Sequence, residues 1–164
     1  MIKIYLAGPL FTTYERKFVD DCALKLRSEG FEVFVPHEKS VKQSSEHVQE
    51  KKQNSLSVKE RAIEVFNRDY EGVSWANVLI AIVDGTQVDD GTATEIGIFA
   101  EQMLSGQNKL GMFGLSSDSR VGPNADTGEG KGLNYFTAGA IYRVGGDIYD
   151  DINGIITELK KIEN

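Results

Sequence analysis

The chain has 164 residues, 40% of them hydrophobic and 26% charged, which excludes disordered, collagen-like and fibrous proteins and favours one domain over 1–164. Its formal net charge of −7 argues against a nucleic-acid partner, because binding a phosphate backbone needs patches of Lys and Arg. With no apolar run of about 18 residues, no signal-peptide layout after Met1 and one cysteine, Cys22, we expect a soluble cytoplasmic protein without membrane contact or disulfides.

Short apolar runs alternate along the chain with segments of helical periodicity. In chain order, the pattern predicts a strand at 2–9, a helix at 14–29, a strand at 31–35, a helix at 57–75, a strand at 77–84, a helix at 92–105, a strand at 109–115, a short helix at 133–140, a short strand at 141–144 and a helix at 147–162. The polar stretch 37–56 reads as a long loop or a partly helical excursion, and 116–132 reads as a loop rich in Gly, Asp and Ser. Alternating strands and helices predict an α/β fold, a five-stranded parallel sheet of flavodoxin-like or Rossmann-like type between helices. Ligands of such folds bind beyond the carboxyl ends of the strands.

One segment of the chain carries the whole acidic excess. From Asp69 to Asn108 there is no Lys or Arg, while the other acidic residues of the chain match its 18 basic residues in number. The seven acidic residues of the segment are Asp69, Glu71, Asp84, Asp89, Asp90, Glu95 and Glu101. The segment is either a solvated acidic surface or a negative site for a cation, a metal or a developing positive charge.

Several common functional motifs are missing from the sequence. There is no P-loop, no G-x-G-x-x-G after the first strand and no G-x-S-x-G nucleophile elbow. His37 and His47 are too sparse for a histidine-based metal site, and we interpret them as surface residues. The candidates for chemistry are therefore carboxyl groups.

Asp69 is the first of these candidates. Ala62, Phe66, Asp69 and Val73 are spaced by four, three and four residues, which places them on one face of a helix. If that face meets the core, a buried carboxyl at its third position holds its proton near neutral pH and can act as a general acid. The alternative is that the face is slightly rotated and that Asp69 pairs with Arg68.

Glu95 is the second candidate. Thr92 and Glu95 fit a capping box at the start of a helix, where the helix dipole favours an ionised carboxylate that can act as a nucleophile or stabilise charge. One protonated and one ionised carboxyl group together are the pattern of glycosyl transfer. Asp89, Asp90 and Gly91 precede this helix and either bind a polar ligand or a metal or simply form a turn.

With these residues in view, the sequence resembles the nucleoside 2-deoxyribosyltransferase family. The likeness runs from the first strand to the last loop, and its most specific part is the Asp-Gly-Thr-x-x-Glu-Ile-Gly pattern. The matching pieces are Ile4-Tyr5-Leu6-Ala7-Gly8-Pro9-Leu10-Phe11, Asn67-Arg68-Asp69, Asp89-Asp90-Gly91-Thr92-Ala93-Thr94-Glu95-Ile96-Gly97 and Gly132-Leu133-Asn134.

The resemblance implies a flavodoxin-like enzyme that exchanges the base of 2′-deoxyribonucleosides with retention, using no metal or organic cofactor. It implies that Glu95 attacks the anomeric carbon, that Asp69 handles the proton on the base, and that Tyr5 orients the nucleophile. The substrate-binding residues that it implies are Asp89 for the base, Asn134 for the sugar 5′-hydroxyl, and Gly8, Phe11, Asp90 and Gly91 from the matching pieces. The partners are a deoxyribonucleoside and a free purine or pyrimidine base, and family members assemble as homo-oligomers, either dimers or hexamers.

Other functions stay open at this point. The first alternative is hydrolysis of nucleosides or nucleoside 5′-monophosphates, for which related enzymes use water as the acceptor, although Asn134 favours a free 5′-hydroxyl. The second is a Mg²⁺-dependent phosphate enzyme built on Asp84, Asp89 and Asp90. The third is a nucleoside-binding module without catalysis. Some members of the family end in an aromatic residue whose carboxylate joins the site, whereas this sequence ends in Asn164. The segment after the second strand, which contacts the base in the family, matches poorly, so the base preference stays open.

Overall fold

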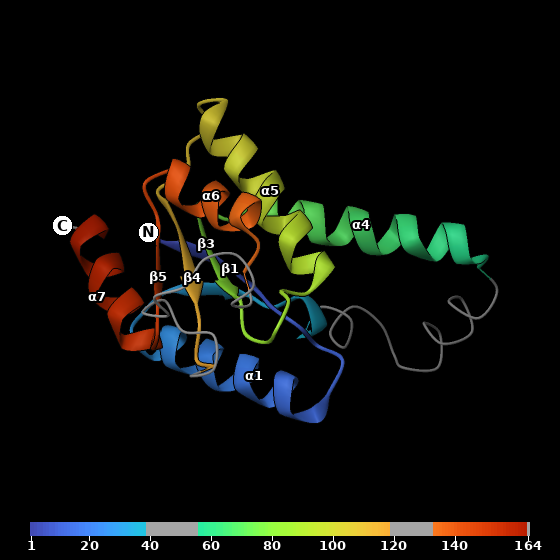
Figure 1. Ribbon diagram of the computed structural model, residues 1–164, viewed down its shortest axis with the longest axis horizontal. Helices are drawn as coiled ribbons and strands as arrows, with labels where there is room; N and C mark the ends of the chain where they lie inside the picture. Colours follow the sequence, from blue (N-terminus) through green and yellow to red (C-terminus); the bar gives the residue numbers. More distant parts are fainter. Residues whose placement is uncertain (39–55, 119–132, 164) are drawn as a thin grey trace.

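The computed structural model describes residues 1–38, 56–118 and 133–163, so His47, Gly132 and most of the two predicted long loops lie outside the described residues (Figure 1). The described helices and strands alternate, as the sequence predicts. In chain order they are β1 (Lys3–Ala7), α1 (Thr13–Ser28), β2 (Glu32–Phe34), α4 (Val58–Trp75), β3 (Val78–Ile82), α5 (Asp90–Leu104), β4 (Gly111–Leu115), α6 (Tyr135–Arg143), β5 (Asp147–Tyr149) and α7 (Ile152–Glu163). None of the helices in the described part of the chain has the length and apolar character needed to cross a membrane.

The five strands form one sheet in the order β2-β1-β3-β4-β5, and every neighbouring pair is parallel. This is the strand order of flavodoxin-like folds, so the predicted fold class is confirmed. Chain connections leave β1 and β3 in opposite directions across the sheet, and ligands of such folds bind at the carboxyl ends of these two strands. The carboxyl edge near β1 and β3 is therefore where a site is expected.

Helices cover both faces of the sheet because successive strand residues point to opposite sides. Ile4 and Leu6 of β1 pack with α1 and α7 on one face. Tyr5 and Ala7 point to the other face, which α4, α5 and α6 cover (Figure 1). Cys22 lies in the first of these two cores, where burial raises the pKa of its thiol to about 11, as expected for a small apolar core residue.

The end of the chain departs from the prediction. Residues 141–144 are not a strand, because α6 continues to Arg143 and the strand is β5 at Asp147–Tyr149, so the predicted helix at 147–162 begins only at Ile152. Ile141 is β-branched, which favours a strand, but here it is fully buried on the inner side of α6. Gly145, at φ 82°, ends the helix and lets the following residues pair with β4.

Helix α4 reaches beyond the sheet. It has 18 residues, or roughly 27 Å at about 1.5 Å per residue, and its last turn leads directly into β3, whose five residues span only about 16 Å. Its first half therefore projects past the carboxyl edge (Figure 1). The predicted core face of this helix is correct only near its end, since Val73 is fully buried while Ala62 is exposed and Phe66 is 52% exposed.

The C-terminal end of α4 is held by Lys109, which precedes β4. Its ammonium group donates hydrogen bonds to the carbonyl oxygens of Val73, Ser74 and Ala76 at 3.0, 3.0 and 2.6 Å. It also lies 4.8 Å from the ring centroid of Phe99. These carbonyls belong to the last turn of the helix and its cap, which have no partners within the helix itself.

We expect Lys109→Met to lower the free energy of unfolding by about 2 kcal/mol, because hydrogen bonds to a charged donor contribute about 1.5–3 kcal/mol and several carbonyl oxygens lose theirs together. Urea denaturation of the variant measures this change. Lys161→Met is the matched control, since Lys161 is exposed and pairs with Glu158 one turn away on the same helix, where a change within about 0.5 kcal/mol is expected. Equal losses in the two variants would contradict the capping role of Lys109.

Candidate active site

Tyr5 is fixed on the sheet face that α4 and α5 cover. Its side chain is fully buried, and its ring stacks on Phe34 with centroids 5.2 Å apart. Gly72 of α4 lies against the same ring, so closely that a Cβ at this glycine would come within 2.8 Å of it. Sequence reasoning missed Gly72, although an isolated glycine inside a helical pattern is a signal of close packing. This close approach brings the last turns of α4 against the middle of β1.

The hydroxyl of Tyr5 donates a hydrogen bond of 2.5 Å to Oε1 of Glu95 on α5. Glu95 does not form the predicted capping box with Thr92, because α5 begins at Asp90 and its N-cap is Asp89. Oδ2 of Asp89 accepts hydrogen bonds from the backbone nitrogen and the hydroxyl of Thr92 at 2.9 and 3.1 Å. Glu95 therefore lies beyond the first turn, and its carboxylate is directed to Tyr5 rather than to the helix terminus.

Burial raises the pKa of Glu95 to about 7, and the negative charges of Asp69 and Asp89 act in the same direction. The hydrogen bond from Tyr5 and the guanidinium of Arg68 act in the opposite direction and lower it. Burial and the neighbouring Glu95 also raise the pKa of the Tyr5 hydroxyl, so Tyr5 keeps its proton and remains the donor. The sequence predicts Glu95 in the first turn, where the helix dipole favours its ionised form, but it lies beyond that turn, and burial moves its pKa toward neutral pH.

Asp69 pairs with Arg68, its neighbour on α4. Nε of Arg68 donates to Oδ1 of Asp69 at 2.8 Å, and Nη2 donates to Oδ2 at 3.2 Å. This is the alternative that the sequence left open. The side chain of Asp69 is 20% exposed, so it lies at the edge of the covered face and not in the core. Both carboxyl groups are half-buried, but they differ in their partners, Arg68 for Asp69 and Tyr5 for Glu95, and burial raises the pKa of Glu95.

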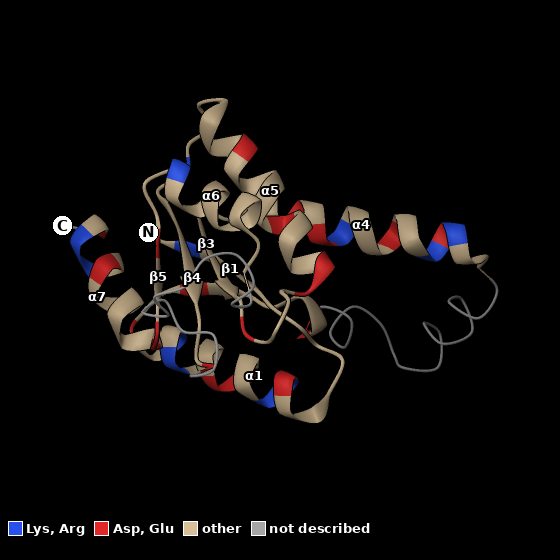
Figure 2. Cartoon of the chain, in the orientation of Figure 1, with Lys and Arg blue, Asp and Glu red and all other residues tan. Residues whose placement is uncertain are grey.

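A cavity of about 420 Å³ opens between α4 and α5, where α4 projects past the sheet. Asp69 and Glu95 lie on its opposite walls, and most of the remaining lining is apolar. The other lining residues are Arg61, Ala62, Val65, Phe66, Tyr70, Val73, Gly91, Thr94 and Ile98. Small-molecule sites have this size and this combination of apolar walls with a few polar groups. Along α5 the charged residues are all acidic, so the cavity has a negative wall (Figure 2).

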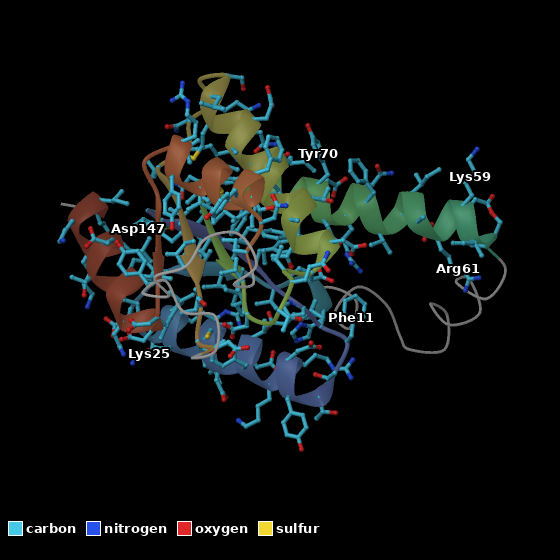
Figure 3. The ribbon with its side chains drawn as sticks, in the orientation of Figure 1. Phe11, Lys25, Lys59, Arg61, Tyr70 and Asp147 are labelled. Carbon is cyan, nitrogen blue, oxygen red and sulfur yellow. The ribbon has the colours of Figure 1, made fainter. Side chains whose placement is uncertain are left out.

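Not all the predicted substrate-binding residues meet at this cavity. Gly91 lines it, and Asp89 caps the helix that forms one wall, while Asp90 is exposed at the first position of that helix. Phe11 is 78% exposed in the turn that leads into α1, well apart from Tyr70 on α4 (Figure 3).

Two more of these residues lie outside the cavity lining. Gly8 packs against Ile82, whose side chain would lie 3.1 Å from a Cβ at this glycine. Asn134 caps α6, where its side chain accepts a hydrogen bond of 2.8 Å from the backbone nitrogen of Phe136. In this single chain, Gly8, Phe11 and Asn134 therefore do not meet Glu95 at the cavity.

The three aspartates proposed for Mg²⁺ are not gathered into one site. Asp84 accepts hydrogen bonds from the backbone nitrogen and hydroxyl of Ser117 at 2.5 and 2.6 Å, whereas Asp89 caps α5. Within residues 1–38, 56–118 and 133–163, no three His, Cys, Asp or Glu side chains are placed to hold a metal ion. His37 is less exposed than predicted, with its Nε2 2.8 Å from Asp20 and 26% of its side chain exposed.

Comparison with known proteins connects this arrangement to a family. The family model for nucleoside 2-deoxyribosyltransferase matches residues 4–135. The fold is shared with a conserved protein from Enterococcus faecalis V583, at a TM-score of 0.70 and 24% identity over 98% of each chain. It is also shared with 2-deoxyribosyltransferase from Bacillus psychrosaccharolyticus, at 0.64 and 24% identity over 93% of this chain and 89% of that chain.

A third solved structure, 2-desoxiribosyltransferase from Leishmania mexicana, has a TM-score of 0.62 and 16% identity over 100% of this chain and 99% of that chain. The comparison with curated proteins found no significant match. The family model nevertheless spans most of the sequence, from β1 through the first residue of α6. The chain therefore belongs to the nucleoside 2-deoxyribosyltransferase family.

Proposed function

We propose that this protein exchanges the base of 2′-deoxyribonucleosides through a covalent deoxyribosyl intermediate on Glu95. The observation that carries the proposal is the contact between Tyr5 and Glu95, 2.5 Å long, on the wall of a cavity whose opposite wall holds Asp69. A half-buried carboxylate with one oxygen engaged by a tyrosine presents its other oxygen to a ligand. The family membership supports the same assignment.

In the first step, a carboxylate oxygen of Glu95 bonds to the anomeric carbon of the deoxyribose. The bond from this carbon to the base nitrogen breaks, and its electron pair leaves with the base, which gains a proton that the Asp69 carboxylate takes up from solvent and passes on. In the second step, the incoming base gives a proton to Asp69 and displaces Glu95 from the anomeric carbon. Two inversions give net retention, as in other glycosyl transfers with a carboxylate nucleophile.

The charge distribution suits this reaction. Breaking the bond to the base develops positive charge on the sugar, which carboxylates stabilise. The segment from Asp69 to Asn108 contains no Lys or Arg. It includes Asp89, Glu95 and the rest of α5, which forms one wall of the cavity. Tyr5 adds a donor that stabilises the carboxylate of Glu95 when it leaves the sugar in the second step.

The proposal is tested by incubating the protein with deoxyinosine and adenine in the presence and absence of EDTA. Deoxyadenosine formed in EDTA supports base exchange, and free hypoxanthine without deoxyadenosine indicates hydrolysis. Activity that EDTA removes indicates the metal enzyme, and no reaction with any deoxynucleoside indicates a binding module. Acid quenching during turnover, followed by mass spectrometry of peptides, should find a deoxyribosyl adduct on the peptide that contains Glu95.

We expect kcat/KM to rise with pH through about 7, because the pKa of Glu95 lies there and only its ionised form attacks the sugar. Below this pH the carboxyl is mostly protonated, and above it the nucleophile is present in full. A pH profile of kcat/KM measures this acidic limb. In Tyr5→Phe the limb should move to higher pH, since the hydrogen bond from Tyr5 lowers the pKa of Glu95. A flat profile between about pH 5 and 8 would contradict the assignment.

We also propose that the protein works as a homo-oligomer, a dimer or a hexamer. Helix α4 exposes several apolar side chains, with Ile63, Val65, Phe66 and Tyr70 between 45% and 52% exposed. Ile63, Phe66 and Tyr70 are spaced by three and four residues and so share one helix face, and an exposed apolar face is typical of protein interfaces. Light scattering of the purified protein gives the number of subunits, and a monomer would contradict the proposal.

A further inference from the structure

Arg68 contacts a residue of the cavity wall but is not itself one of the lining residues. Asp69 lines the cavity between α4 and α5, whereas Arg68 does not. The guanidinium of Arg68 nevertheless meets both carboxylate oxygens of Asp69, with Nε and Nη2 at 2.8 and 3.2 Å. The two side chains are 34% and 20% exposed, so the pair is partly withdrawn from solvent. A fork with two hydrogen bonds fixes the plane of a carboxylate in a way that a single contact does not.

The charge of Arg68 also reaches Glu95. The groups that act on Glu95 come from three elements, Tyr5 from β1, Arg68 and Asp69 from α4, and Asp89 at the start of α5. The two aspartates raise the pKa of Glu95, and Arg68 lowers it. Arg68 is also the last basic residue before the cation-free segment that begins at Asp69. It is therefore placed as a counter-charge to the acidic groups of the site.

Building on the proposed function, we propose that Arg68 is a positioning residue for deoxyribosyl transfer, whose guanidinium holds the Asp69 carboxylate at the cavity wall and balances the negative charge around Glu95. Arg68 touches no reacting atom in this scheme and acts through its two neighbours. A neutral side chain at position 68 removes both effects. A lysine restores the charge but cannot make the planar pair of hydrogen bonds.

The two effects separate in a set of variants measured in two ways. Four proteins are labelled with ¹³C at the glutamate carboxyl carbons: wild type, Arg68→Gln, Arg68→Lys and the control Arg16→Gln. The control changes an exposed arginine of α1. The Glu95 signal is assigned by its loss in Glu95→Gln, and its titration is followed in each protein without substrate. Base exchange between deoxyinosine and adenine is then measured over the same pH range.

We expect Glu95 to titrate at higher pH in Arg68→Gln than in wild type, and near the wild-type value in Arg68→Lys and Arg16→Gln. Above the acidic limb, kcat should fall by about tenfold or more in both Arg68 variants with little change in KM, because a misoriented Asp69 transfers its proton poorly to a substrate that still binds. Arg16→Gln should keep the wild-type kcat.

Two results would overturn the inference. An unchanged Glu95 titration in Arg68→Gln refutes the counter-charge, and a wild-type kcat in Arg68→Lys refutes the positioning of Asp69. A wild-type protein that exchanges no bases refutes the proposed function instead, and the titration without substrate still decides the effect of Arg68 on Glu95. Arg68→Lys keeps the charge and most of the volume, so the test does not depend on the folding of the neutral variant alone.

Discussion

Glu95→Ala is expected to lower kcat for base exchange by about 10⁴-fold or more, as the loss of a covalent nucleophile does in other enzymes. The reason is geometric, because Glu95 is the carboxylate that Tyr5 engages on the cavity wall. Glu101→Gln is the matched control, since Glu101 is an exposed acid on the same helix and should keep the wild-type rate. Exchange of deoxyinosine with adenine, followed by chromatography, measures both variants.

The loss of activity should not come from unfolding. The N-cap of α5 is Asp89, so replacing Glu95 leaves the helix cap intact. Burial raises the pKa of Glu95 from an ordinary value near 4.5 to about 7, so between these values the folded chain binds more protons than the unfolded chain. The contribution of Glu95 to stability therefore falls as pH rises through this range. Glu95→Gln removes the cost of ionising a carboxyl group at this position, so at pH values above 7 the variant should have a higher Tm than wild type. A Glu95→Ala protein that is folded and nearly fully active would refute the assignment of Glu95 as nucleophile.

The order of the strands and helices could be predicted because it depends on local patterns. β3 is buried along its whole length, and a continuous apolar run is the ordinary signal of such a central parallel strand. The location of the site at the carboxyl edge of the sheet could be predicted from the same alternation, since parallel strands joined by helices have their carboxyl ends at the same edge. The end of the chain was predicted less well, because Ile141 and Val144 favour a strand locally while packing against the sheet keeps the first of them in a helix.

Three residues of the cavity lining, Asp69, Gly91 and Glu95, could be named from the sequence, but the arrangement of the candidate site could not. Tyr5 and Glu95 are 90 positions apart in the sequence, so no local pattern predicts their contact. Only the family resemblance implied it. The environments of the two acids were harder to predict, because they depend on where α4 ends on the sheet. Gly72 brings the last turns of α4 onto Tyr5, so Asp69 falls at the edge of the covered face beside Arg68, while Glu95 meets the hydroxyl of Tyr5 and burial raises its pKa.

Asp69→Asn is expected to lower kcat by about 10²- to 10⁴-fold with little change in KM, because the amide keeps the size and polarity of the side chain but cannot carry a proton to and from the base. Pre-steady-state measurement of base release from deoxyinosine isolates the affected step. Glu71→Gln, an exposed acid on α4, is the control for a changed charge on this helix.

The substrate offers a second control for Asp69. A nucleoside whose base leaves readily without protonation needs less help from a proton donor, so Asp69→Asn should slow its cleavage less than that of deoxyinosine. If Asp69 served only to bind the base, the two substrates would be affected alike, and KM would rise with kcat unchanged. The ion pair with Arg68 makes this distinction informative, because it holds Asp69 at the cavity wall where either role is geometrically open.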